Sequence, residues 1–362
     1  MGKTFENEYA PTTVSHPGMT LKETLDALGM SQRELAKRMG RPLKTINEIV
    51  NGKTWITPET ALQLETVLGV PANFWLKRQN QYDESLARKK QSQELVHHIA
   101  WAKSFPLKEM NTQFGLPLHK DKVEQARQLL MYFGVASPTQ WQDYWNIAAV
   151  NYRKSIVFAA HTEALSAWLR QGEIQAQRIR CEDFDAKKLK TALGEIRFLS
   201  TQSPEVFQPR LRELCASCGV AHVLVPELPK TRVCGATRWL TTKKAVLQQS
   251  LRYKWSDQFW FTFFHEAAHL ILHNEDLILE IADGARDKKE EEANRFAMDT
   301  LIPPDDFNNF VASGDFTERG VKIFARRAGI LPAIVVGRLQ YERDLQFNQL
   351  NGLRQRFQWA HG

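Results

Sequence analysis

The chain has 362 residues, which is long enough for two or three domains with sizeable hydrophobic cores. Its formal charge of +7 favours approach to polyanions, but a charged fraction of 25% is ordinary, so charge alone does not identify nucleic acid as a partner. The first residues lack the apolar core of a secretory leader, and no stretch reaches the length of a membrane helix. We therefore expect a cytoplasmic protein without a membrane partner.

Two short helical patterns lie near the N-terminus. A capped helix is expected from Ser31 to Gly40, and a Gly-Arg-Pro turn then leads into a second helix at residues 43–52. Two helices joined in this way form a helix-turn-helix, whose second helix enters the major groove of DNA. Helical hairpins are common, so periodicity alone leaves a scaffold role as reasonable as DNA binding.

The outward face of the second helix carries side chains that suit DNA. Ile46 and Ile49 are expected to face inward, which leaves Lys44, Thr45 and Asn47 on the outward side. These residue types reach phosphates and base edges, and asparagine pairs well with adenine. We therefore predict that these three side chains contact DNA.

This region resembles the lambda-repressor-like (XRE) domain of HigA-type antitoxins. The resemblance covers roughly the first 85 residues and rests on several separate segments, namely His16-Pro-Gly-Met-x-Leu-Lys, Trp55 through the Ala-Leu-x-Leu after residue 60, Phe74-Trp75 and Tyr82-Asp83. It implies a DNA-binding domain at residues 1–85 that binds double-stranded operator DNA as a homodimer, with the chain's own promoter as the expected operator. It also implies that Gln32 contacts backbone phosphate.

The following region, residues 86–185, is helical in pattern. We predict a helical connector in which the tryptophans are core residues and the Arg88-Lys89-Lys90 cluster is a solvated face. From about Leu189 the pattern becomes α+β, with a helix through Leu214 and strands near residues 220–225, 234–240 and 245–251.

The most informative motif is His265-Glu266-Ala-Ala-His269 inside an apolar helical run. Residues four apart lie on the same face of a helix, so His265 and His269 can both bind one ion. Glu266 sits about 100° round the same turn, where it can take a proton from water that zinc has made more acidic. The motif also occurs by chance in buried helices, but a core has no use for three ionisable groups unless something satisfies them.

A third ligand is expected from a helix that begins near residue 289 and ends at Pro303-Pro304. Glu290 and Asn294 are four residues apart, so one can bind metal while the other orients a ligand. The three consecutive glutamates at 290–292 also suit a helix N-terminus without any metal.

These two segments together resemble the ImmA/IrrE-type metallopeptidases, which act on or with repressor partners. The family places its glutamate ligand four residues before the Asn of an Ala-Asn-x-Phe-Ala core, which is Glu290 here. The resemblance implies that Zn²⁺ is bound by His265, His269 and Glu290 in a zincin-like α+β domain at residues 186–362.

Other candidates are weaker. Cys215-Ala-Ser-Cys218 has CxxC spacing, but a second such pair is missing from the sequence, so reduced core thiols are favoured over another metal or redox site. The residue that stabilises an oxyanion is not evident, and Tyr253, Arg238 and His273 remain open.

The sequence thus predicts a multidomain protein with an all-α helix-turn-helix domain, a helical connector and an α+β peptidase domain. We expect a regulator with a zinc endopeptidase, in which Glu266 activates water to hydrolyse a peptide bond of a repressor or toxin-associated protein. The alternative is a non-catalytic antitoxin or repressor whose zinc domain binds a toxin or effector.

Overall fold

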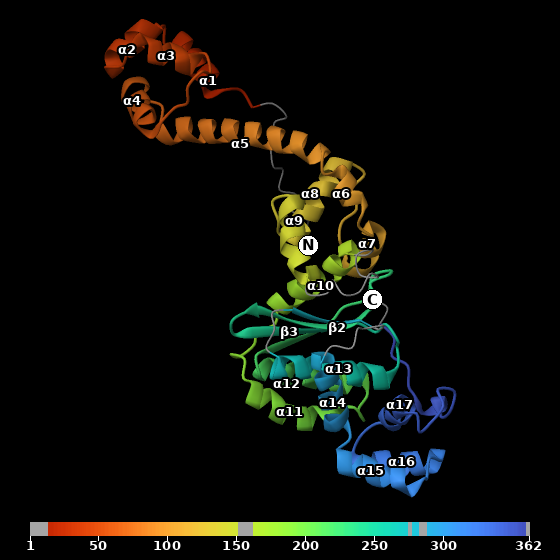
Figure 1. Cartoon of the computed structure of the whole chain (residues 1–362). Helices are drawn as coiled ribbons and strands as arrows, with labels where there is room; N and C mark the ends of the chain where they lie inside the picture. The colour runs from red at the N-terminus through yellow and green to blue at the C-terminus, as the bar shows by residue number, and fades with distance from the viewer. Residues whose placement is uncertain (1–13, 151–161, 274–276, 282–287, 360–362) are drawn as a thin grey trace, which may run out of the picture. The chain divides into compact units, whose positions relative to one another are not determined.

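The computed structural model describes residues 14–150, 162–273, 277–281 and 288–359, with the side chains of 146–150 and 277–281 left aside. It divides into two compact units, residues 1–98 and 99–362 (Figure 1). The first residues, on which the expected localisation rests, and part of the connector, 151–161, lie outside the described residues. Among the helices that are described, none is both long and apolar enough to cross a bilayer.

The described part of the first unit consists of five helices: α1 Pro17–Ala27, α2 Gln32–Met39, α3 Leu43–Val50, α4 Pro58–Leu68 and α5 Ala72–Val96. Ser31 caps α2 by accepting a hydrogen bond from the Glu34 amide, and Gly40 ends the helix in the left-handed region with φ 65°. The helix-turn-helix prediction is therefore confirmed. The predicted domain boundary after residue 85 falls within α5. Fully buried apolar side chains form the core of this unit, among them Leu21, Leu35, Ile46, Leu64 and Trp75.

The second unit begins with helices α6 Ile99–Lys103, α7 Leu107–Phe114, α8 Lys122–Phe133, α9 Pro138–Val150 and α10 Thr162–Gln177. Aromatic rings of α6, α8 and α9 pack edge to face, with Trp101 and Trp141 centred 5.8 Å apart. α10 is fixed to the sheet by Trp168, whose indole nitrogen donates to the Val225 carbonyl at 3.0 Å. The helical pattern predicted for this region is thus present in its described part.

The sheet has four described strands: β1 Val220–Leu224, β2 Val233–Thr241, β3 Lys244–Gln249 and β4 Leu277–Ile281. Their order is β1-β3-β2-β4, with β1 parallel to β3 and both other pairs antiparallel. The prediction of one helix through Leu214 is wrong, because α11 Ala186–Leu199 ends before α12 Pro204–Ser217 begins at a proline. β4 was not predicted.

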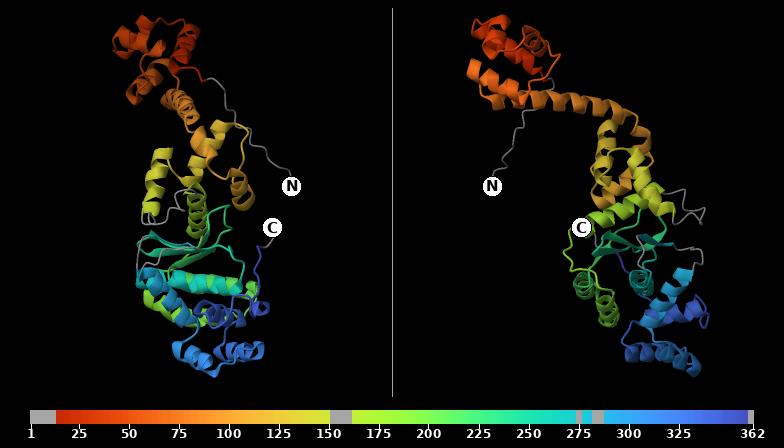
Figure 2. Two further views of the ribbon diagram at one scale, coloured as in Figure 1. Left: turned by 45° about the vertical axis from the view of Figure 1, so that its right-hand side comes forward. Right: turned by 60° about the vertical axis from the view of Figure 1, so that its left-hand side comes forward.

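Helix α13 Ser256–Leu272 lies on the sheet face opposite α10 (Figures 1 and 2). It is the central helix of the unit, and Trp260, Phe263 and Phe264 are fully buried in the hydrophobic core. The chain continues with α14 Lys288–Leu301, α15 Pro304–Ser313, α16 Glu318–Ala328 and α17 Pro332–Glu342. Helices α14 and α17 both pack against α13, so the functional motif of α13 is enclosed by a sheet and neighbouring helices.

Candidate metal centre

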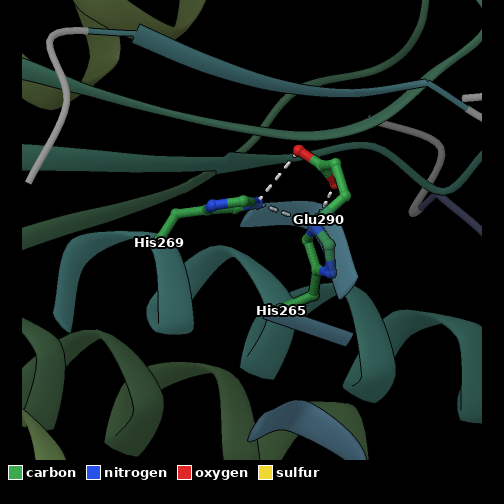
Figure 3. A group of neighbouring side chains, drawn as sticks. All are labelled: His265, His269 and Glu290. Carbon is green, nitrogen blue, oxygen red and sulfur yellow. Dashed lines mark hydrogen bonds and ion pairs between the residues drawn. The ribbon is translucent and has the colours of Figure 1, made fainter. Parts of the chain in front are cut away.

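The structure brings His265, His269 and Glu290 together (Figure 3). The two histidines rise from successive turns of α13, and Glu290 reaches them from the first turn of α14. The Nε2 atoms of the histidines lie 2.9 Å apart, and the Glu290 oxygens lie 3.1 Å from His265 Nε2 and 3.5 Å from His269 Nε2. We call these three residues the His–His–Glu triad.

The donor set of the triad fits zinc. In a tetrahedral site with bonds of about 2.0–2.1 Å, ligand atoms stand roughly 3.4 Å from one another. The three separations in the triad, 2.9 to 3.5 Å, lie close to that value, and all three ligand atoms fall within 4.8 Å of each other. Two imidazoles and one carboxylate are also a ligand combination found in catalytic zinc sites.

Neighbouring side chains set the tautomers of both histidines. His265 Nδ1 lies 2.9 Å from Asn294 Oδ1, an oxygen that only accepts, so Nδ1 carries the hydrogen. His269 Nδ1 lies 3.0 Å from His273 Nδ1, while His273 Nε2 lies 3.1 Å from a Glu292 oxygen. When both rings are neutral, His273 Nε2 donates to the Glu292 carboxylate, so His273 Nδ1 carries no hydrogen. His269 Nδ1 must then donate to His273 Nδ1. Both Nε2 lone pairs are therefore directed into the triad.

The ionisation of the triad follows from burial and from these contacts. Burial lowers the pKa of His269 and outweighs the opposite effect of Glu290. Burial by itself would raise the pKa of Glu290, but its contacts with the imidazoles of His265 and His269 prevail and lower that pKa to about 2. A neutral imidazole and an ionised carboxylate are the forms that bind metal.

Glu266 is held by strand β2. It is fully buried, and the Thr237 hydroxyl donates to its Oε2 at 2.5 Å. Gly235 lies so near that a β-carbon at this position would be 2.5 Å from Glu266 Oε1. Only glycine lets the strand approach the carboxylate this closely.

The three residues considered for an oxyanion differ in their positions. Arg238 pairs with Glu173 of α10, on the sheet face away from α13, so the structure places it outside the triad's surroundings. His273 lies behind His269, where it orients a ligand. Tyr253 is 39% exposed in the loop before α13, beneath the guanidinium of Arg252.

No disulfide bond joins any of the four cysteines, all of which lie in the described residues. Cys215 and Cys218 are buried, and burial raises the pKa of Cys215. Among the described residues, the His–His–Glu triad is the one group arranged for a metal ion, so the CxxC spacing forms no second site in that part of the chain.

The residues predicted to contact DNA lie together on the first unit. Lys44 and Asn47 are exposed on α3, while Thr45 and Gln32 are partly exposed. Asn47 Nδ2 donates to Gln32 Oε1 at 3.4 Å, which joins the start of α2 to the face of α3. Lys44 forms a long pair with Glu48, at 3.8 Å, and keeps 84% of its side chain in solvent.

The amide of Asn47 is also fixed by Asn51, whose Nδ2 donates to Asn47 Oδ1 at 3.0 Å. An amide oxygen has two lone pairs and an amide nitrogen has two hydrogens. Asn47 therefore keeps one acceptor site and one donor hydrogen beyond these contacts. This is the pair of groups that a bidentate contact with adenine requires.

Four residues support the centre in roles that were not predicted from the sequence, namely Gly235, Thr237, His273 and Glu292. His273 was considered only as a residue that stabilises an oxyanion. For His273 a signal existed, because it follows His269 by four residues and so continues the face that carries both ligands. Thr237 and Gly235 lie about thirty residues before Glu266, and no local pattern connects them to it.

Comparison with known families finds one match in each of the two compact units. A helix-turn-helix family model matches residues 21–75, and the IrrE N-terminal-like domain model matches residues 252–339. The second match spans α13 and α14, which carry the triad. Both resemblances predicted from the sequence are confirmed.

Individual relatives match the first unit. An uncharacterised HTH-type transcriptional regulator of Escherichia coli, YddM, is 37% identical over 73 residues, which are 20% of this chain and 78% of that protein. Virulence-associated protein I of Dichelobacter nodosus is 40% identical over 83 residues, or 22% and 77% of the two chains. A HigA-family addiction module antidote protein from Coxiella burnetii is 38% identical in sequence, with a TM-score of 0.22, covering 23% of this chain and 92% of that structure.

The fold and the motifs define a helix-turn-helix protein that also carries an IrrE-like domain. Two sequence relatives are more than 30% identical to this chain over more than two thirds of their own length, which is enough to assign a family. The chain belongs to the family of HTH-type regulators.

Proposed function

We propose that this protein is a DNA-binding regulator whose second unit is a zincin-like zinc endopeptidase that hydrolyses a peptide bond of a repressor or toxin-associated protein. The observation that carries the proposal is the His–His–Glu triad, in which both Nε2 lone pairs converge with a carboxylate beside Glu266. A purely structural metal site needs no general base, and Glu266 occupies the position after the first ligand.

In this proposal His265, His269 and Glu290 hold Zn²⁺, and Glu266 is the general base. Bound zinc would supply Lewis acidity, which lowers the pKa of water and polarises a peptide carbonyl. Glu266 would accept the proton of the attacking water and pass it to the leaving amine. Thr237 fixes one oxygen of Glu266, and Gly235 leaves room for the carboxylate against β2.

The regulator half of the proposal rests on the first unit. Gln32, Lys44, Thr45 and Asn47 share one surface, and the relatives include a protein named as an HTH-type transcriptional regulator. We propose that α3 reads base edges of an operator in the chain's own promoter, with Gln32 on phosphate and the protein acting as a homodimer.

One observation favours the alternative, a regulator whose zinc domain only binds a toxin or effector. Glu266 is fully buried and Thr237 donates to one of its oxygens, so water must enter a buried region before the carboxylate can act as a base. The two functions differ in one outcome, which is whether a peptide bond is cut.

Glu266→Gln tests this difference because it keeps the size of the side chain and removes the base. The variant should retain zinc and DNA binding while losing all proteolysis. Cells that express the parent or the variant are compared by labelling of protein N-termini. Proteolysis predicts at least one new N-terminus that depends on Glu266. Identical sets of N-termini would favour the binding-only function, and loss of zinc from the variant would show that Glu266 is misassigned.

A further inference from the structure

Helices α16 and α17 of the second unit are joined in the same way as the helix-turn-helix pair α2 and α3. In both pairs the first helix ends at a glycine in the left-handed region, Gly40 with φ 65° and Gly329 with φ 69°. The next helix begins three residues after that glycine in both cases. The first helix also begins alike, because the hydroxyl of Ser31 or Thr317 accepts a hydrogen bond from the amide three residues further on. The local signals of a helix-turn-helix thus occur twice in the chain.

The two pairs differ in the exposure of their second helix. Residues 333–336 of α17 are at most 4% exposed, because this helix packs against α13. In α3, by contrast, Lys44 and Asn47 are exposed. The second helix of a helix-turn-helix reads base edges, and the first crosses the phosphate backbone. Burial excludes the first role for α17 and leaves the second role open to α16.

The outer face of α16 is positively charged. This helix lies at the edge of the second unit, away from the sheet (Figures 1 and 2), and Val321 and Ala325 anchor it in the hydrophobic core. Four cations are exposed on it, namely Arg319, Lys322, Arg326 and Arg327. At about 100° per residue, the first three fall within an arc of about 60°. We call these four residues the α16 basic face.

Contacts within the chain do not account for the α16 basic face. Among the described residues Lys322 pairs with Glu318 at 2.5 Å, and the three arginines form no ion pair. Basic residues in the last turn of a helix interact favourably with its dipole, which explains Arg326 and Arg327. Arg319 lies in the first turn, where a cation is unfavourable. The charge of this face is therefore available for an anion outside the chain.

The composition of the α16 basic face favours nucleic acid over an acidic protein. Ile323, 57% exposed, is the one large apolar side chain on the exposed side of this helix. Protein interfaces have apolar or aromatic anchors at a centre that is poor in charge, whereas interfaces with nucleic acid are polar and positively charged. Three of the four cations are arginines, whose guanidinium binds phosphate through two parallel hydrogen bonds.

We infer that the α16 basic face binds the phosphate backbone of double-stranded DNA without reading its sequence. The chain then has two surfaces for DNA. The first unit supplies base preference, and the second unit adds affinity that depends strongly on salt and little on sequence. The inference depends neither on zinc nor on the reading of bases by α3.

Lysine footprinting of the full chain locates the contact. The Lys322 side chain is 52% exposed, so an acetylating reagent reaches it in the free protein. A saturating duplex of mixed sequence should slow its acetylation at least fivefold at low salt and have no effect at molar salt. Lys187, exposed on α11, should react at an unchanged rate. Unchanged acetylation of Lys322 would overturn the inference. Stronger protection of Lys322 by an oligoglutamate peptide than by the duplex would also overturn it and assign the face to an acidic protein.

The triple variant Arg319→Gln/Arg326→Gln/Arg327→Gln measures the contribution to affinity. Glutamine is a good helix former, so these exposed changes should leave α16 intact. Each phosphate contact that is lost reduces the slope of log affinity against log salt by about 0.9. The slope for the mixed duplex should therefore fall by about two to three. The ratio of promoter to mixed-duplex affinity should stay constant, and a changed ratio would refute binding without sequence reading.

A matched control removes the same net charge from α11, where three exposed lysines spread over about 160° of the helix: Lys187→Gln/Lys188→Gln/Lys190→Gln. This variant should change the slope by less than about one. Equal slopes in the two triple variants would overturn the inference. Failure of the proposed operator reading is distinguishable, because protection of Lys322 by a duplex of any sequence would then persist without a preference for the promoter.

Discussion

The recognition face of α3 and the His–His–Glu triad of α13 both come from helices, but they differ in burial. Lys44 keeps 84% of its side chain in solvent, whereas His265 and His269 are 1% and 0% exposed. On the exposed face the contacts between side chains are solvated, so we expect substitutions there to have moderate effects. In the triad each histidine is oriented by a partner, Asn294 or His273, so one change affects several groups.

The largest effect is expected at the triad itself. The parent should carry about one zinc ion per chain, and His265→Ala or His269→Ala should lose most of it, because two protein ligands hold zinc poorly. Metal analysis of the purified chain measures this. His97→Ala is the control, since His97 is exposed in the first unit. Full zinc occupancy in the double variant His265→Ala/His269→Ala would show that α13 does not provide the zinc ligands.

Gly235→Ala should separate chemistry from metal binding. The added methyl would lie 2.5 Å from Glu266 Oε1, so the carboxylate must move while the triad keeps its ligands. A displacement of about 1 Å typically costs on the order of a hundredfold in rate. We expect that loss in the cleavage that depends on Glu266, with zinc retained. Gly194→Ala, where nothing lies within 4 Å, is the matched control. Equal rates in both variants would refute the proposed contact between β2 and the base.

The three consecutive glutamates at 290–292 should differ in their effect on zinc binding. Glu290→Gln should weaken zinc binding most, and Glu292→Gln should weaken it less, because the glutamine oxygen can still accept from His273 Nε2 but the amide no longer forces that nitrogen to be the donor. Neighbouring Glu291 is exposed, so Glu291→Gln should have no effect. Chelator competition gives the three affinities. A ranking in which Glu291→Gln is the weakest binder would contradict the geometry.

The exposed face should respond in a different way. Asn47→Ala should cost about 1–3 kcal/mol at the operator and relax the preference for one base. Lys44→Ala should weaken binding to all sequences alike and reduce the slope of affinity against salt by about one. Binding of the full chain to its own promoter and to mixed duplex DNA gives both values. Salt-insensitive binding, or none, would make the helix-turn-helix a protein-docking module.

Much of this architecture could be predicted from local sequence patterns. The caps at Ser31 and Gly40, the spacing of His265 and His269, and the prolines after α14 are short-range signals that the structure reproduces. The break before Pro204 and strand β4 were missed, although Pro204 was a visible signal for a helix start. The contacts of Thr237 and Gly235 with Glu266 depend on how β2 packs against α13, and a single sequence does not contain that register.

The central claim is that two imidazoles and a carboxylate bind zinc in this protein. Zinc K-edge X-ray absorption of the purified full chain tests it most directly. The account predicts two imidazole nitrogens and one or two oxygens at about 2.0–2.2 Å, with no sulfur, and a weakened signal in Glu290→Gln. Sulfur neighbours at about 2.3 Å would show that cysteines bind the metal, and protein that binds no zinc would also contradict the account.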